Sequence, residues 1–118
     1  MTESVPPRPL SSEERVLVEF ILRADFPGSE KLREQIDSVE VVGRCECGCG
    51  TVNLRVRGAS DNRSVEGLLP AEAHGEGVDV LLFARAGFLS CLELVFHDDR
   101  LPRPFPSPRD LRLVSDDS

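Results

Sequence analysis

Three cysteines crowded into one short segment are the residues of this chain with the clearest capacity for chemistry. Cys45, Cys47 and Cys49 alternate with other residues in the run 44–50, which also contains glycine. Thiolates bind soft metal ions, and they can also pair as disulfides. A free cysteine behaves equally well as a small apolar side chain. The segment is therefore a candidate metal site, a candidate thiol-redox site or a part of the core.

A shared metal ion would require this segment to curl. Alternate residues of an extended chain lie roughly 6–7 Å apart, which is too far for two thiolates on one zinc ion. Gly48 and Gly50 permit the curl. A tetrahedral site then needs a fourth ligand, for which the sequence offers Cys91, with His97 or His74 as alternatives. Zinc is the expected metal, and copper in its lower oxidation state suits the same thiolates.

Other patterns give no support for catalysis. Cys91 and His97 do not form a nucleophile and base, because six residues of one extended strand separate their backbones by roughly 20 Å. His74 lies among glycines and is expected in a solvent-facing loop. Ser90 does not fit a nucleophile-elbow motif, and no phosphate loop or dinucleotide fingerprint occurs. We therefore expect no enzymatic activity and no catalytic residue.

Length and composition indicate one soluble domain. The chain has 118 residues, of which 40% are hydrophobic and 30% charged, with a formal net charge of −7. A nucleic-acid binder needs a basic stripe, so nucleic acid is not the expected partner. Residues 1–118 are taken as a single domain, with an extended arm over 1–9 and a disordered tail over 115–118.

The expected compartment is the cytoplasm. Apolar runs are too short to cross a bilayer, so no membrane association is expected. The first residues lack a basic region followed by an apolar stretch, as a secretory signal would have. Thiols stay reduced in the cytosol, which favours a metal site or buried thiols over disulfides.

Two helices are predicted before the strands. Ser11 and Glu14 form a capping-box pattern, and apolar residues at helical spacing follow it until the chain reaches Pro27. A shorter helix is predicted from Ser29.

The rest of the chain favours strands. Pro70 restricts one of them to a sheet edge, and Ala86-Gly87 suits a tight hairpin. Residues 102–108 are expected to wrap over the surface, followed by one helical turn. The predicted strands cover residues 39–42, 51–57, 65–73, 78–85 and 88–96. We expect an α+β fold in which two N-terminal helices pack on one face of an antiparallel meander of four to five strands.

The last hairpin suggests association with another protein. A regular two-residue turn would pair Leu81 with Leu92 and Phe83 with Ser90. Both faces of this hairpin would then be apolar, and the helices can cover only one of them. We expect the second face to be covered in part by Phe105 and its neighbours, and otherwise by a homodimer or a partner protein.

Three segments resemble a group of small bacterial proteins that have no assigned activity. The similar segments cover residues 8–15, residues 41–45 with 47–49, and residues 87–94, and none is a catalytic signature. The resemblance implies no functional residue. Small acidic cytosolic proteins of this kind are similar to immunity proteins, which bind and neutralise a toxin. We therefore expect a non-catalytic protein-binding domain, with metal binding or thiol redox at Cys45, Cys47 and Cys49 as the alternative.

Overall fold

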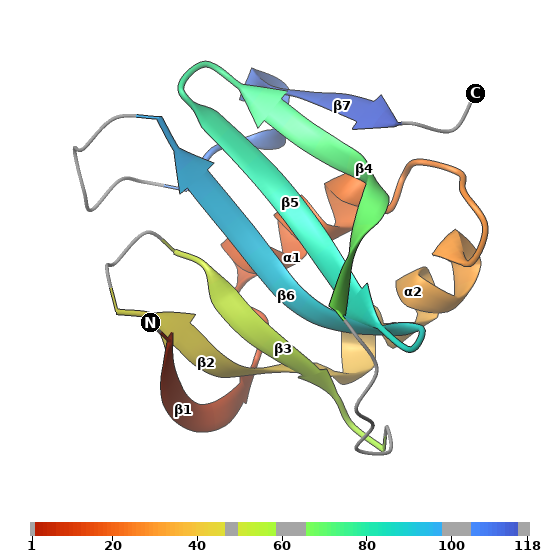
Figure 1. Ribbon diagram of the computed structural model, residues 1–118, viewed down its shortest axis with the longest axis vertical. Helices are drawn as coiled ribbons and strands as arrows, with labels where there is room; N and C mark the ends of the chain where they lie inside the picture. Colours follow the sequence, from red (N-terminus) through yellow and green to blue (C-terminus); the bar gives the residue numbers. More distant parts are fainter. Residues whose placement is uncertain (1, 47–49, 59–65, 98–104, 116–118) are drawn as a thin grey trace.

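The structure is a computed structural model that describes residues 2–46, 50–58, 66–97 and 105–115. Within those residues the chain forms two α-helices and one antiparallel sheet of seven strands, in the order β1-β2-β3-β6-β5-β4-β7 (Figure 1). The elements are β1 (Thr2–Pro9), α1 (Ser12–Ile21), α2 (Ser29–Gln35), β2 (Val39–Cys45), β3 (Val52–Val56), β4 (Glu66–Gly75), β5 (Val78–Arg85), β6 (Phe88–Phe96) and β7 (Leu111–Ser115), with single 3₁₀ turns η1 (Ile36–Ser38) and η2 (Pro108–Asp110).

The predicted architecture is wrong in its sheet. Two helices do precede β2, but the sheet has seven strands rather than four or five, and sheet dominates the fold. The sheet is also not a simple meander, because β3 pairs with β6 and not with β4. Two strands that the sequence pattern did not indicate, β1 and β7, form the two edges of the sheet.

Prolines explain why β1 was expected to be an arm. The strand contains Pro6, Pro7 and Pro9, and proline lacks the N–H that a sheet ladder needs. At an edge only one side of the strand is paired, so proline is tolerated there. β1 pairs with β2 on either side of an irregularity between Ser4 and Arg8.

Pro70 led to the prediction that β4 is an edge strand, and this prediction is wrong. β4 lies between β5 and β7. Pro70 falls within the register shift that separates Leu68 from Glu72, and pairing with β7 begins only at Ala71. The bulge therefore accommodates the proline without placing β4 at the edge.

The end of the described chain also differs from the prediction. Pro108–Asp110 form a 3₁₀ turn, but Leu111–Ser115 then continue as β7, where a helical turn was expected. Phe105 packs against the main core cluster, close to Gly50 and Leu94. It therefore helps to close the core and does not cover the second face of the sheet.

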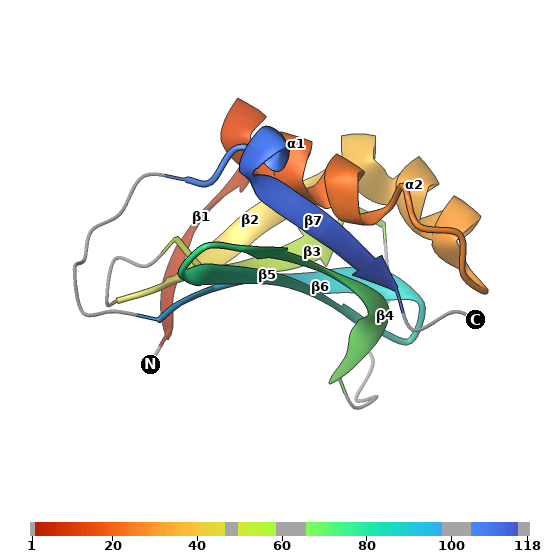
Figure 2. The same cartoon turned by 90° about the horizontal axis from the view of Figure 1, so that it is seen from above.

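The core lies between the helices and one face of the sheet. α1 and α2 lie against the same face, as Figure 2 shows, and no helix of the described residues lies over the other face. α1 buries its apolar stripe there through Leu17, Val18 and Ile21. Alternate residues of β5, namely Val78, Val80 and Leu82, point toward the helices and are buried.

The hairpin of β5 and β6 has the predicted turn but another register. Ala86 and Gly87 both have positive φ, at 52° and 84°, as a two-residue turn of type I′ requires. Ala84 pairs with Leu89 and Phe83 pairs with Cys91, so Ser90 is an extra residue in β6. This bulge shifts every later pair by one residue and places Leu92 and Leu94 on the core face.

The start of α1 is tied to β1 by a buried carboxylate. Ser11 and Glu14 form the predicted capping box, with both reciprocal hydrogen bonds present. Glu14 also accepts hydrogen bonds from Nη1 and Nη2 of Arg8, each at 2.9 Å, and its side chain is only 4% exposed. Burial opposes ionisation, but the hydrogen bonds from Arg8 and Ser11 outweigh it and lower the pKa of Glu14.

Candidate functional site

Cys45 is the only member of the cysteine segment whose position the described residues include. It ends β2, pairs with Thr2 of β1, and its N–H donates to the carbonyl of Thr51 at 2.9 Å. β2 therefore extends beyond the predicted strand over residues 39–42 and includes Cys45. Cys47 and Cys49 lie outside the described residues. Zinc binding or redox chemistry at these thiols stays a prediction.

Cys91 lies on another strand from Cys45. It is buried on β6, where it pairs with Phe83 of β5 and with Asn53 of β3. Because β3 lies between β2 and β6, the strands that carry Cys91 and Cys45 are about 10 Å apart. Two sulfur ligands of one zinc ion must lie within about 4 Å of each other. The sheet order therefore does not favour Cys91 as a ligand shared with Cys45.

The two histidines of the chain meet at one carboxylate, which the sequence analysis did not anticipate. His74 Nδ1 lies 2.6 Å from Asp79 Oδ1, and His97 Nε2 lies 2.9 Å from Asp79 Oδ2. The second ring nitrogen of His74 is 3.4 Å from Glu72 Oε1. His97, expected as an alternative metal ligand, thus forms part of a histidine–carboxylate cluster with His74, Asp79 and Glu72.

Sheet register brings this cluster together. His74 is in β4 rather than in a loop, and it pairs directly with Asp79 of β5 across the two-residue turn Glu76-Gly77. His97 follows the end of β6, and its backbone N–H donates to the carbonyl of Gly77 at 2.9 Å. A hairpin turn assigned to Glu76-Gly77 would have indicated the pair, since Gly77 has the positive φ of 76° that favours glycine.

The cluster perturbs two titrations in opposite directions. The hydrogen bond to Asp79 raises the pKa of His74, against a smaller effect of burial, and the charges of Asp79 and Glu72 act in the same direction. The hydrogen bond from His74 lowers the pKa of Asp79, again against a smaller effect of burial. Each group therefore stabilises the charged form of the other.

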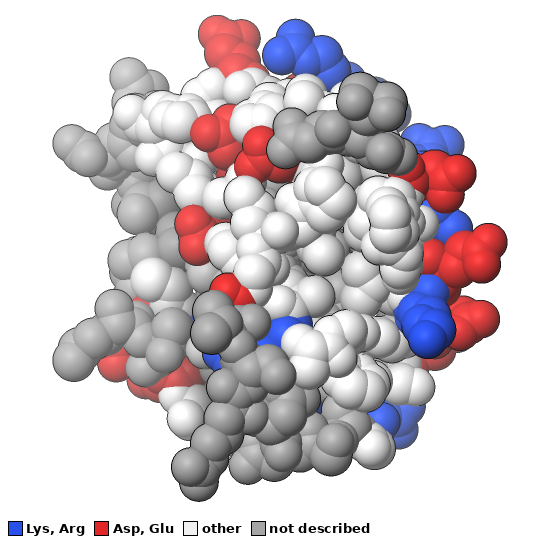
Figure 3. Space-filling model, turned by 45° about the vertical axis from the view of Figure 1, so that its right-hand side comes forward, with Lys and Arg blue, Asp and Glu red and all other residues white. Residues whose placement is uncertain are grey.

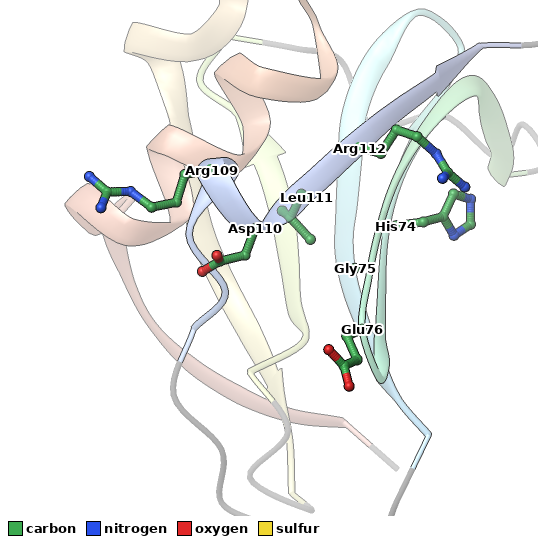
Figure 4. Close-up of a pocket in the computed structure, with 7 residues that line it drawn as sticks. All are labelled: His74, Gly75, Glu76, Arg109, Asp110, Leu111 and Arg112. Carbon is green, nitrogen blue, oxygen red and sulfur yellow. The ribbon is translucent and has the colours of Figure 1, made fainter.

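An open depression of about 380 Å³ lies beside His74 (Figure 4). Its lining is mostly polar and carries both signs of charge: His74, Gly75, Glu76, Arg109, Asp110, Leu111 and Arg112. His74 and Arg112 pair across β4 and β7, and Figure 4 shows their side chains close together, whereas Arg109 points away. Such an open, mixed surface lacks the enclosed apolar lining of a small-molecule pocket.

Within the described part of the chain, the hydrogen bonds of the cluster join imidazole rings to carboxylates. The ring nitrogens of both histidines contact only carboxylates, so neither activates a serine or cysteine there. No group of three or more His, Cys, Asp or Glu side chains in those residues is arranged to hold a metal ion. The arrangement can instead store a proton between an imidazole and two carboxylates.

The cluster belongs to a larger surface that we call the open face, the side of the sheet opposite the helices. Its members are fixed by alternation: Asp79, Leu81 and Phe83 of β5 point away from the core. Their cross-strand partners share that face. In β4 to β7 the open face comprises the apolar residues Leu68, Leu81, Phe83, Cys91, Val95 and Val114, the acidic residues Glu66, Glu72, Asp79 and Glu93, the basic residues Arg85 and Arg112, and His74.

Acidic and apolar side chains are interspersed on this surface. Figure 3 shows this side of the sheet obliquely, with red acidic groups within a white area and most blue basic groups near the edge of the view. Leu68 is 50% exposed, and the only other large hydrophobic residue exposed to a similar degree among the described residues is Val16 of α1, at 42%. The open face therefore combines an exposed apolar anchor with an excess of acidic over basic side chains.

The segments that carry the bacterial resemblance have structural roles. Residues 8–15 include the Arg8–Glu14 contact and the α1 cap. Gly43 packs so closely against Asn53 that a side chain would clash. Residues 87–94 contain the hairpin turn and the β6 bulge. None of the three segments includes a member of the histidine–carboxylate cluster.

Comparison of the chain with protein families, curated proteins and solved structures gives no match. Among the described residues, no helix is long and apolar enough to cross a membrane.

Proposed function

We propose that this protein is a non-catalytic binding protein and that its open face contacts a partner protein. The observation that carries the proposal is the exposure of Leu68 on the sheet face that the helices leave uncovered. Leu68 pairs with Phe83, and Leu81 lies two residues further along β5, so an apolar strip runs through this surface. Apolar strips rimmed by polar groups are typical of protein interfaces.

Charge defines the kind of partner. Around the strip the acidic residues Glu66, Glu72, Asp79 and Glu93 outnumber the basic residues Arg85 and Arg112, and the whole chain has a formal net charge of −7. Opposite charge accelerates encounter and favours the matching surface over others. A basic surface of another protein is therefore the expected occupant.

The same charge argues against a homodimer through this face. A two-fold interface brings each patch against its own copy. The acidic groups of the open face would then oppose one another, and like charges across an interface are unfavourable. The homodimer expected from the hairpin pattern is thus the competing outcome of the test below.

An immunity-type role is the specific form of this proposal. Such a protein acts by occupying a surface of a toxin, which needs a stable sheet and a complementary face but no catalytic group. The proposal rests here on the acidic open face together with the resemblance to small bacterial proteins.

Photo-crosslinking at two exposed apolar positions tests the proposal. A photoreactive phenylalanine analogue replaces Leu68 on the open face in one variant and Val16 on α1 in the matched control. In the native cells we expect position 68, but not position 16, to form an adduct with a basic protein. An adduct between two copies of the chain, together with a dimer in light scattering, would support the homodimer instead.

Binding measurements with the purified partner complete the test. Leu68→Arg should weaken the affinity at least about tenfold, because it removes the apolar anchor and adds repulsion, whereas Val16→Arg should have little effect. The affinity should also fall with ionic strength. Equal loss in both variants would show that the open face is not the interface.

A further inference from the structure

The surroundings of His74 offer two hydrogen-bond acceptors, and a neutral imidazole has only one N–H to donate. Its Nδ1 is 2.6 Å from Asp79 Oδ1 and its Nε2 is 3.4 Å from Glu72 Oε1, so both ring nitrogens face carboxylates. A neutral imidazole has one N–H and would direct the lone pair of its other nitrogen at an anion. The imidazolium form has two N–H groups and matches both carboxylates.

The charged groups around His74 come from every neighbouring element. Asp79 approaches from β5 and also contacts His97, which follows β6. Arg112 of β7 is the cross-strand partner on the other side and opposes protonation. Glu72 lies in β4 itself, and Glu76 with Asp110 and Arg109 lines the adjacent depression. The nearest contacts are the two carboxylates, and they raise the pKa of His74.

We propose that a proton held by His74 between Asp79 and Glu72 regulates the open face. While the proton is bound, the imidazolium neutralises part of the acidic surface. When it leaves, the surface loses one positive charge, and two carboxylates lose a cationic neighbour. This inference rests on the proposed function, because the regulated event is the binding of a basic partner to the same face.

The direction and the size of the effect follow from this arrangement. Binding strengthens as the pH rises through the titration of His74, whose midpoint lies above its ordinary value of 6.5. Lys and Arg on the partner stay charged throughout that range. A single exposed charge changes affinity by about two- to fivefold at moderate ionic strength. The regulation is therefore graded.

An NMR titration of the full chain tests the proton site without any partner. We expect the His74 ring to titrate above pH 6.5 and its midpoint to fall in Asp79→Asn, which keeps the side-chain size but removes the charge. Glu72→Gln provides a second variant if Asp79→Asn does not fold, and it should lower the midpoint less. A midpoint that is the same in the wild type and in a folded variant would overturn the proposal.

Binding of an oligolysine peptide tests the regulation. The wild type should bind the peptide about two- to fivefold more tightly at about pH 8 than at about pH 5.5. His74→Asn should remove most of this difference. The matched control His97→Asn should retain the larger part of it, because His97 contacts Asp79 alone, whereas His74 contacts both Asp79 and Glu72.

The two experiments separate the two ideas. Binding without a His74-dependent pH effect would overturn the regulation and leave the open face as an acidic interface. If His74 titrates as expected but the peptide binds at neither pH, the proposed acidic interface fails and its regulation fails with it.

Discussion

The buried Glu14 carboxylate provides the sharpest test of how β1 and α1 are held together. Glu14→Ala removes three hydrogen bonds: two from the Arg8 guanidinium at 2.9 Å and one from the Ser11 N–H at 2.8 Å. The Ser11 hydroxyl, which caps the Glu14 N–H at 3.1 Å, stays in place. The substitution thus removes half of the capping box and the whole contact to β1.

The exposure of the two partners determines how much unfolding free energy Glu14→Ala removes. Hydrogen bonds to charged groups contribute about 1.5–3 kcal/mol each when both partners are buried. Arg8 is 45% exposed and regains water when Glu14 is absent, so its two bonds count for less. Loss of the hydrogen bond from the Ser11 N–H destabilises the fold by about 1 kcal/mol more. The higher helix propensity of alanine offsets a few tenths of a kcal/mol of this loss. We expect the free energy of unfolding to fall by about 2–3 kcal/mol, which lowers Tm by about 8–12 °C.

Thermal unfolding followed by circular dichroism measures this effect against Glu13→Ala. Glu13 is exposed in the same first turn, so its removal makes the same change in charge and should cost about 0.5 kcal/mol or less. The sign of the pH dependence gives a second check. Because the folded-state pKa of Glu14 lies below 4.5, its contribution is complete above pH 4.5 and is lost as the pH falls through the folded-state pKa. Equal Tm values for the two variants, or a difference that does not shrink in acid, would refute this account.

Two backbone positions give further predictions. Ala86→Asn should raise the free energy of unfolding by about 0.5–1 kcal/mol, because asparagine tolerates the φ of 52° better than alanine does. Asparagine followed by glycine, here Gly87, is also the preferred pair in a type I′ turn. A lower Tm in this variant would contradict that turn type. Gly43→Ala should cost about 1–3 kcal/mol, since the added methyl would displace the Asn53 amide at 2.8 Å and would lie only 3.2 Å from the Glu3 carbonyl oxygen of the backbone. The matched control Gly67→Ala, where the added methyl meets no atom within 4 Å, should be close to neutral in denaturant unfolding. Equal effects of the two glycine substitutions would show that the β2–β3 contact is not tight.

Features encoded within a few consecutive residues could be predicted from the sequence. The capping box of Ser11 and Glu14 starts α1 as expected, and Ala86-Gly87 forms the expected hairpin turn. These features depend on hydrogen bonds and backbone angles within one turn of chain. Local sequence is therefore sufficient to specify them.

The candidate site could not be predicted in the same way. His74 was assigned to a loop, and Asp79 was not identified at all, because the pairing of the two depends on where the β4–β5 turn falls. His97 reaches the same carboxylate only because β6 is the other neighbour of β5. A cluster made by three strands has no signature in any single segment of the chain.

The sequence by itself determined the order of helices before β2, the apolar face of α1 and the turn of the last hairpin. The tertiary structure decided which strands lie at the edges, where proline in β1 is harmless because one side of the strand needs no partner. It also decided the faces of β6, where the single extra residue Ser90 moves Leu92 to the core. The physical reason is that strand order and register are set by burial of apolar surface over the whole sheet, and a shift of one residue reverses every side chain that follows.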